Sequence, residues 1–363
     1  MKPTIYATFL ALAIAAGCSG YTAPVGPPPP PPPPPAPPPP AFTLFETLGD
    51  SVSIADKLTE FRAALGGSLN APNSPPADSG RREINWDGVP AALTNVDTFP
   101  STFFNVNSKR GAVYVGDGNG LRVDSTLFAA VNPDFGAQFA TFSAKKLFMP
   151  VGSNVVNVVF RLVGTSTPAL VKGFGAVFVD VDRVGSTTIE FFDADDQPIG
   201  TLRAPNHAGS HLLSFTGAVF QGAIVARVRI TSGDAALTPT IEDVTAGGAA
   251  DLVVMDDFVY GEPLPIGPDA QVTVGNDFFR SARNGTQNPA VDTVRAGARV
   301  AWTWSAAGSH SIRSTGLPPE VFRNSVVMSA QGSTYSVRFL NPGNYTYDCA
   351  VHGAAMTGRI VVK

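Results

Sequence analysis

Four side chains near the C-terminus of this 363-residue chain form a potential metal-binding set. Cys349, His352 and Met356 lie within one short segment, and His310 lies upstream, after a strand-like run. A thiolate, two imidazoles and a weakly bound thioether are the ligands of a blue-copper electron-transfer site. In such a site the deprotonated cysteine and the two imidazoles complete a trigonal plane, and the methionine approaches along the axis. We therefore predict one type 1 copper ion bound by these four residues.

The cysteine count supports this interpretation. The sequence holds two cysteines, Cys18 and Cys349. If Cys18 is consumed by lipid, Cys349 is an unpaired thiol in an exported protein, which calls for an explanation. Metal binding is one explanation. A buried inert thiol and a disulfide between Cys18 and Cys349 are the alternatives.

The N-terminus has the layout of an export signal. Met1-Lys2 precedes an apolar run from Ile5 to Ala16, which is too short to span a membrane. Ala15-Ala16-Gly17-Cys18 resembles the lipobox of bacterial lipoproteins, which implies cleavage after residue 17 and lipidation of Cys18. An ordinary cleaved leader is the alternative. Ser19 favours the outer membrane, so we expect a lipoprotein of the periplasm or cell surface.

The rest of the chain divides by composition. Residues 18–41 are rich in proline and predict a polyproline II tether, which rises about 3.1 Å per residue. Residues 42–262 predict a first domain, and a proline-rich link after Glu262 opens a second domain over 263–363. The many glycines and prolines and the scarcity of helical patterns indicate an all-β protein.

The first domain is predicted to be a jelly-roll-like β-sandwich. The spacing of Ile54, Leu58, Phe61 and Leu65 predicts one helix, which Ser53 would cap and Gly66 would end. Beyond it, alternation predicts strands with one buried face, as around Val156–Leu162 and Ile224–Ile230.

Acidic pairs in this domain could bind a structural calcium ion through oxygen ligands. The candidates are Asp180 with Asp182 and Asp256 with Asp257. Acidic residues at strand ends are more often simply solvated, and this alternative stays open.

In the second domain, alternation predicts a small antiparallel sandwich or barrel. Period-two alternation places Tyr345, Tyr347 and Cys349 on one face, so that the thiol ends a strand and points inward. The loop that follows would bring His352 and Met356 back over the sulfur.

At this point the second domain resembles a cupredoxin of the plastocyanin family. The resemblance rests on an upstream histidine, a Pro-Gly turn, an aromatic strand ending in cysteine, and a closely following histidine and methionine. These are His310, Pro342-Gly343, Cys349, His352 and Met356. The sequence departs from plastocyanins in two ways: the spacing from His352 to Met356 is one residue shorter, and Ser311 replaces an asparagine after the first histidine.

The resemblance implies a membrane-anchored type 1 copper protein that carries single electrons in the cell envelope and is not an enzyme. Its expected partners are a redox protein and the membrane, with no nucleic acid. One alternative is a copper-buffering protein that does not cycle electrons. Another is a protein that binds glycan or a surface polymer through the first domain, with the cupredoxin as an accessory.

Overall fold

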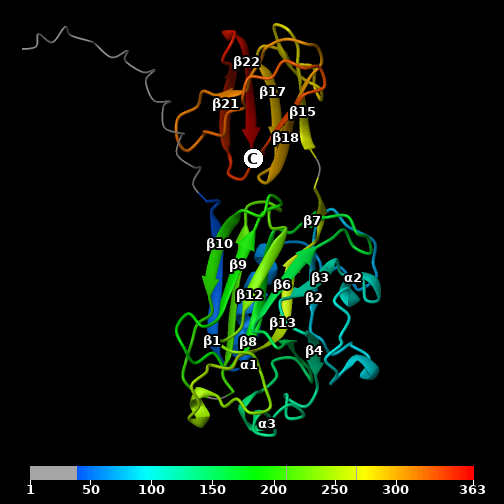
Figure 1. Cartoon of the computed structure of the whole chain (residues 1–363), viewed down its shortest axis with the longest axis vertical. Coiled ribbons are helices and arrows are strands. Elements are labelled where there is room, and N and C mark those ends of the chain that lie inside the picture. Colours follow the sequence, from blue (N-terminus) through cyan, green and yellow to red (C-terminus); the bar gives the residue numbers. More distant parts are fainter. Residues whose placement is uncertain (1–38, 210, 267) are drawn as a thin grey trace, which may run out of the picture. The chain divides into compact units, whose positions relative to one another are not determined.

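The computed structural model describes residues 39–209, 211–266 and 268–363, shown in Figure 1. The expected signal peptide, Cys18 and nearly all of the proline-rich tether lie outside the described residues. Two separate groups of buried hydrophobic residues occur in the described part, one from Ile54 to Tyr260 and one from Ala270 to Val362. None of the helices in these ranges has the length and apolar character needed to cross a membrane.

The first group lies in a sandwich of two antiparallel sheets. The seven-stranded sheet contains β1 (Phe42–Gly49), β11 (Leu213–Phe220), β8 (Gly173–Val179), β13 (Val254–Gly261), β5 (Leu147–Val151) and β4 (Gly120–Asp124), with β2 (Arg81–Ile84) on β13. The five-stranded sheet contains β10 (Pro198–Arg203), β9 (Thr188–Phe192), β12 (Arg227–Thr231), β6 (Val155–Phe160) and β3 (Ala112–Gly116). A short pair joins β7 (Ala169–Leu170) to β14 (Leu264–Pro265). The predicted jelly-roll-like sandwich is confirmed.

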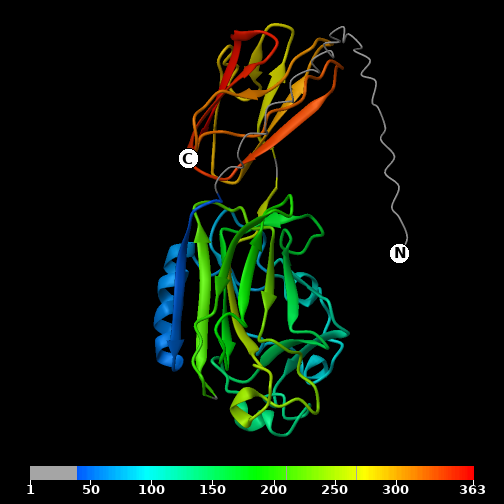
Figure 2. The ribbon, with the colours of Figure 1, turned by 60° about the vertical axis from the view of Figure 1, so that its left-hand side comes forward.

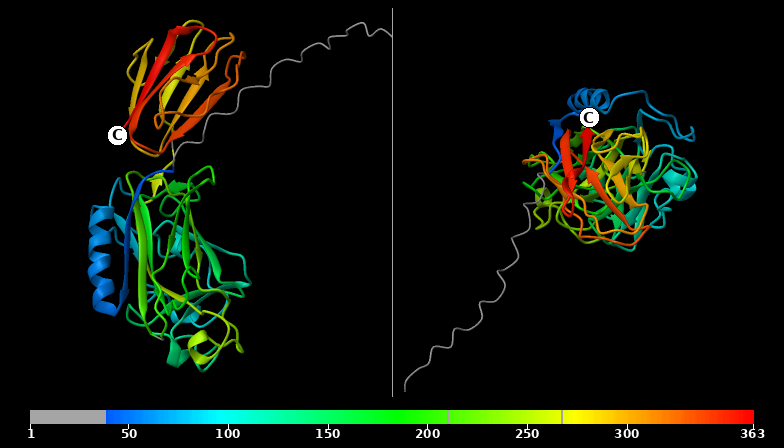
Figure 3. Two further views of the ribbon diagram at one scale, coloured as in Figure 1. Left: turned by 90° about the vertical axis from the view of Figure 1, so that its left-hand side faces the viewer. Right: turned by 90° about the horizontal axis from the view of Figure 1, so that it is seen from above.

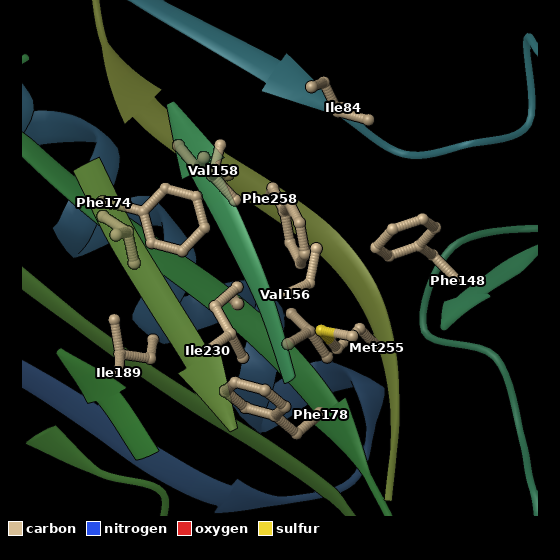
Figure 4. Packing of buried hydrophobic residues seen from close by; sticks show 14 of the residues in the cluster. Ile84, Phe148, Val156, Val158, Phe174, Phe178, Ile189, Ile230, Met255 and Phe258 are labelled. Atoms are coloured by element: carbon tan, nitrogen blue, oxygen red, sulfur yellow. The ribbon is translucent and has the colours of Figure 1, made fainter. Parts of the chain in front are cut away.

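Alternating side chains from the two sheets meet in the core of this sandwich. Val156 and Val158 of β6 and Ile230 of β12 are fully buried, as are Phe178 of β8 and Phe258 of β13, and Figure 4 shows them together. Along β6 every second residue is buried, which is the predicted alternation. Strands β8, β11 and β13 are buried along their whole length instead, because both faces of the seven-stranded sheet are covered at these strands.

The predicted helix is α1 (Ser51–Leu65), which covers the outer face of the seven-stranded sheet beside β1 (Figures 2 and 3). Its four predicted apolar positions are its buried residues. Phe61 packs edge-on against Phe215 of β11, with 5.3 Å between the ring centroids. The predicted cap was wrong. Asp50 caps the helix by accepting the Ser53 backbone N–H at 2.9 Å, because a carboxylate three residues earlier reaches that free donor. Gly66 ends the helix with φ 80°, as predicted.

Short helical turns that the sequence did not indicate occur in the connections. They are α2 (Phe103–Val106), α3 (Phe135–Gln138) and the 3₁₀ turns η1 (Ala91–Leu93) and η2 (Val244–Ala246). Each is a single turn, too short to produce a helical period in the sequence.

The second group of buried residues lies between two four-stranded sheets. One contains β16 (Phe279–Ser281), β15 (Pro268–Val274), β18 (Ala298–Trp304) and β20 (Thr334–Phe339). The other contains β17 (Ala290–Val294), β22 (Gly353–Val362), β21 (Gly343–Cys349) and β19 (Arg313–Ser314). The expectation of a wholly antiparallel domain was wrong, since β15 pairs with β18, and β17 with β22, in parallel. Alternation reports which face of a strand is buried and carries no information about strand direction.

Candidate metal centre

Strand β21 carries Cys349 into the second core. Tyr345, Tyr347 and Cys349 are buried in alternation along it, as period two predicts, and the thiol is fully buried and free. Asp348, on the other face, is also buried, and its carboxylate accepts two hydrogen bonds from Arg313 at 2.8 and 2.7 Å, which offset the cost of burying the charge. This ion pair joins β21 to β19 beside the thiol.

His310 is held by its own backbone. Its N–H donates to the Met328 carbonyl at 3.0 Å, and the Met328 N–H donates back to the His310 carbonyl at 2.9 Å. The Trp304 indole, at the end of β18, donates to the same Met328 carbonyl at 3.0 Å. The segment between β18 and β19 is therefore fixed at His310, which is only 2% exposed.

His352 and Met356 follow Cys349 at the turn into β22. The His352 N–H donates to the Cys349 carbonyl at 3.1 Å, which closes this turn. The register then shifts: Cys349 pairs with Gly353, whereas Asp348 pairs with Thr357. The bulge lies on β22 between these pairs and contains Met356, whose side chain is fully buried in the same core as Cys349. Met356 is thus part of a bulged strand, where a loop was expected.

The nitrogen and sulfur atoms converge. The Cys349 Sγ lies 3.4 Å from the His352 Nδ1 and 3.9 Å from the His310 Nδ1. The two imidazole rings are 4.9 Å apart between centroids, and one ligand atom from each of the three residues lies within 4.8 Å of the others. Both histidines present the same ring nitrogen to the sulfur, so one ion could contact all three side chains.

The environment suits a metal ion that binds neutral imidazole. Burial, and secondly the neighbouring His352, lower the pKa of His310, which keeps its ring uncharged near neutral pH. Within the described residues, the buried His310 Nε2 has no hydrogen-bond partner. A buried free thiol with two imidazole nitrogens is a donor set that copper accepts. The residues present therefore fit the predicted copper ion.

Ser311 has a role that the sequence did not indicate. Its hydroxyl accepts the Ala350 backbone N–H at 3.0 Å and so links the residue after His310 to the residue after Cys349. From the sequence, this serine was only a departure from the asparagine of plastocyanins. In the structure it joins the two ligand-bearing segments to each other.

The acidic candidates of the first domain separate into two places. Asp180 and Asp182 meet Asp243, a residue that the sequence did not suggest, with one oxygen of each within 4.8 Å of the others. Burial is the main cause that raises the pKa of Asp180 to about 7 and that of Asp182 to about 6, with repulsion from neighbouring carboxylates adding to it. No spacing rule links Asp243 to residues some sixty positions earlier.

Asp256 and Asp257 lie apart from this cluster, on β13. Asp256 accepts two backbone N–H groups, from Phe142 at 2.7 Å and Ser143 at 3.2 Å, and the Ser143 hydroxyl at 2.8 Å. These donors hold both oxygens of its carboxylate. Asp256 therefore fixes the connection before β5, and the structure does not bring it together with Asp180 and Asp182.

Comparison with known proteins identifies the second domain. The family model described as "Copper binding proteins, plastocyanin/azurin family" matches residues 286–363. Chloroplastic plastocyanin of Tetradesmus obliquus is 32% identical over 82 residues, which cover 21% of this chain and 57% of that protein. Amicyanin-alpha of Methylorubrum extorquens is 31% identical over 93 residues, covering 26% of this chain and 76% of that protein. The chain thus spans little more than half of the first relative and about three quarters of the second.

Among solved structures, a purple cupredoxin from Nitrosopumilus maritimus is 24% identical, with a TM-score of 0.21 and coverage of 26% of this chain and all of that one. The matched segment contains His310, Cys349, His352 and Met356. Through this C-terminal domain the chain belongs to the plastocyanin/azurin family of copper-binding proteins.

Proposed function

We propose that this protein is a single-electron carrier with one type 1 copper ion, bound by His310, Cys349, His352 and Met356. The observation that carries the proposal is the approach of two imidazole Nδ1 atoms to one buried thiol, at 3.4 and 3.9 Å. Copper in this donor set supplies reversible one-electron chemistry between Cu(I) and Cu(II).

The protein's contribution is a set of ligands that is fixed before the metal arrives. Cys349 ends a paired strand, and His310 is held by two backbone hydrogen bonds to Met328. The Ser311 hydroxyl joins these two segments through the Ala350 N–H. Since these contacts limit movement of the ligands, little reorganisation would accompany a change of charge, which favours electron transfer over substrate turnover.

One ligand lies close to solvent. His352 is partly exposed, whereas His310 and Cys349 are buried, and the neighbouring Val351, Ala354 and Ala355 are exposed. An uncharged surface of small apolar side chains beside a ligand suits brief docking of a redox protein, because weak interfaces are small and release quickly. We therefore assign electron entry and exit to the His352 side of the site.

The cellular setting is part of the proposal and rests on sequence alone. The lipobox-like Ala15-Ala16-Gly17-Cys18 would place a lipid on Cys18, and the proline-rich residues 18–41 would hold both domains away from the membrane. The protein would then act in the periplasm or at the cell surface, anchored in the outer membrane.

The experiment that tests copper binding measures the visible and electron paramagnetic resonance spectra of the copper-loaded chain. We expect an intense visible band from thiolate-to-copper charge transfer, reversible loss of the band on reduction, and its absence from Cys349→Ser. Cys18→Ser is the matched control, since it removes the only other cysteine and should keep the band. A band that survives Cys349→Ser would refute the site.

The same control variant tests the anchor. In cells, Cys18→Ser should move the protein from the membrane fraction to the soluble fraction and leave the spectrum unchanged. If this variant stays with the membrane, the proposed lipid anchor is wrong while the copper site stands.

A further inference from the structure

The carboxylates of Asp180, Asp182 and Asp243 gather at one end of the first sandwich. Asp180 and Asp182 directly follow β8, and Asp243 precedes the turn η2. Asp243 Oδ1 accepts the Thr245 N–H at 2.8 Å and the Thr245 hydroxyl at 2.6 Å, and its Oδ2 accepts the Leu252 N–H at 2.8 Å. One oxygen from each residue lies within 4.8 Å of the other two. All three side chains are buried, with exposures of 0%, 7% and 1%.

Two of these carboxylates each have one oxygen held and one oxygen unpartnered. Asp180 Oδ2 accepts a hydrogen bond from Gln138 at 2.7 Å, and Asp182 Oδ1 accepts the Gly209 N–H at 2.8 Å. Their other oxygens, Asp180 Oδ1 and Asp182 Oδ2, are buried and have no hydrogen-bond partner among the described residues. A buried unpartnered carboxylate oxygen costs folding free energy unless something satisfies it.

The charges in this cluster are not balanced by the protein. Within the described ranges, none of the three carboxylates forms an ion pair with a lysine, arginine or histidine at 4.0 Å or less. Asp251 adds a fourth acid nearby, and its oxygens already accept the Asp182 and Arg183 N–H groups and the Ser186 hydroxyl. Three carboxyl groups buried together without a paired lysine, arginine or histidine point to a missing cation.

We propose that Asp180, Asp182 and Asp243 bind one calcium ion in the first domain. Calcium takes six to eight oxygen ligands at about 2.3–2.6 Å, so ligands on opposite sides of the ion can be about 5 Å apart, which accommodates the observed spacing. Magnesium demands near-octahedral geometry and keeps several waters, which suits a buried carboxylate cluster less well. The remaining ligands would be backbone carbonyls or water.

This ion would have a structural role. The segment after β8 and the η2 segment are separated by some sixty residues, and a bound ion would join them where carboxylates now repel one another. The site is independent of the copper centre, because its residues belong to the first domain and share no ligand with the second.

The test measures calcium binding to the full mature chain by titration calorimetry, and thermal unfolding in calcium and in a chelator. We expect one calcium ion per chain and a higher unfolding temperature in calcium. Asp182→Asn should weaken calcium binding by at least about tenfold, in the range that metal-site substitutions cost. The same variant should unfold at an equal or higher temperature than the wild type in chelator, because it removes one repelling charge.

The controls separate this site from general charge effects. Asp117→Asn removes an exposed acid, and Asp257→Asn removes a buried acid on β13 outside the cluster; both should keep the calcium response. Absence of calcium binding by the wild type would overturn the proposal, as would equal binding by Asp182→Asn. Magnesium binding as tight as calcium binding would overturn the assignment of the ion. The visible copper band should be the same in all these variants.

Discussion

At the scale of the residue, the His310 ring packs so closely against Gly308 that a side chain at position 308 would have no space. A Cβ added to Gly308 would lie 2.8 Å from the His310 Nε2 and 3.0 Å from the Asn276 Oδ1. Carbon and nitrogen do not approach this closely without displacement, so Gly308 is required for the position of the ring. The His310 Nδ1 is the ring atom that faces the Cys349 Sγ, at 3.9 Å.

We therefore expect Gly308→Ala to rotate or displace His310 and to weaken copper binding by about tenfold or more, as changes around metal ligands commonly do. Competition with a copper chelator measures the affinity, and the visible band reports the geometry. Gly88→Ala is the control, because an added Cβ there meets nothing within 4 Å. Unchanged affinity and spectrum in Gly308→Ala would show that the ring position does not depend on this glycine.

At the scale of the element, α1 contributes its whole apolar face to the first core. Leu58 is fully buried, with 0% of its surface accessible to solvent. Replacing it with alanine should lower the free energy of unfolding by about 2–5 kcal/mol, through lost burial and the cavity that remains. Chemical denaturation measures this change. Val52, on the same helix, is 65% exposed, so Val52→Ala should change the free energy of unfolding by less than about 0.5 kcal/mol. Comparable losses in both variants would contradict the packing described.

Asp256 of strand β13 makes the stability of the protein depend on pH. Burial, and then the adjacent Asp257, raise the pKa of Asp256 to about 8. The folded protein therefore holds this proton more tightly than the unfolded chain, whose aspartates have a pKa near 3.8. It follows that the Asp256 contribution to stability is present below about pH 4 and is lost as pH rises toward 8.

Asp256→Asn removes this titration. The difference in unfolding free energy between wild type and variant should therefore change steadily between about pH 4 and 8, in the direction of a relative gain for the variant at high pH. Denaturant unfolding at a series of pH values measures the difference. Parallel pH profiles for the two proteins would mean that Asp256 is ionised with an ordinary pKa.

Features that depend on local sequence patterns could be predicted from the sequence, and features that depend on packing of distant segments could not. Cys349, His352 and Met356 could be proposed as a set because they lie in one segment, and the helical face of α1 could be predicted because its period is local. The meeting of Asp180 with Asp243 could not, since it depends on how distant loops pack. Strand direction and the Asp50 cap were also missed, because alternation reports burial only and two polar residues competed for one cap position.

At the scale of the whole molecule, the described chain contains two hydrophobic cores without a shared buried residue. Cys349 and Met356 belong to the second core, whereas the Asp180 cluster follows β8 of the first. A ligand that binds only the folded state raises the stability of the unit that binds it. Copper should therefore act on the second core and leave the first unaffected.

Calorimetry of the full chain should accordingly show two unfolding transitions, of which copper loading raises one and leaves the other at its temperature. The transition that does not respond to copper should belong to residues of the first core, so Leu58→Ala should lower that transition alone. Cys349→Ser supplies the second control, because it should abolish the response to copper without removing either transition. A single transition that shifts with copper would mean that the two cores unfold as one cooperative unit, because copper binding would then stabilise both cores together.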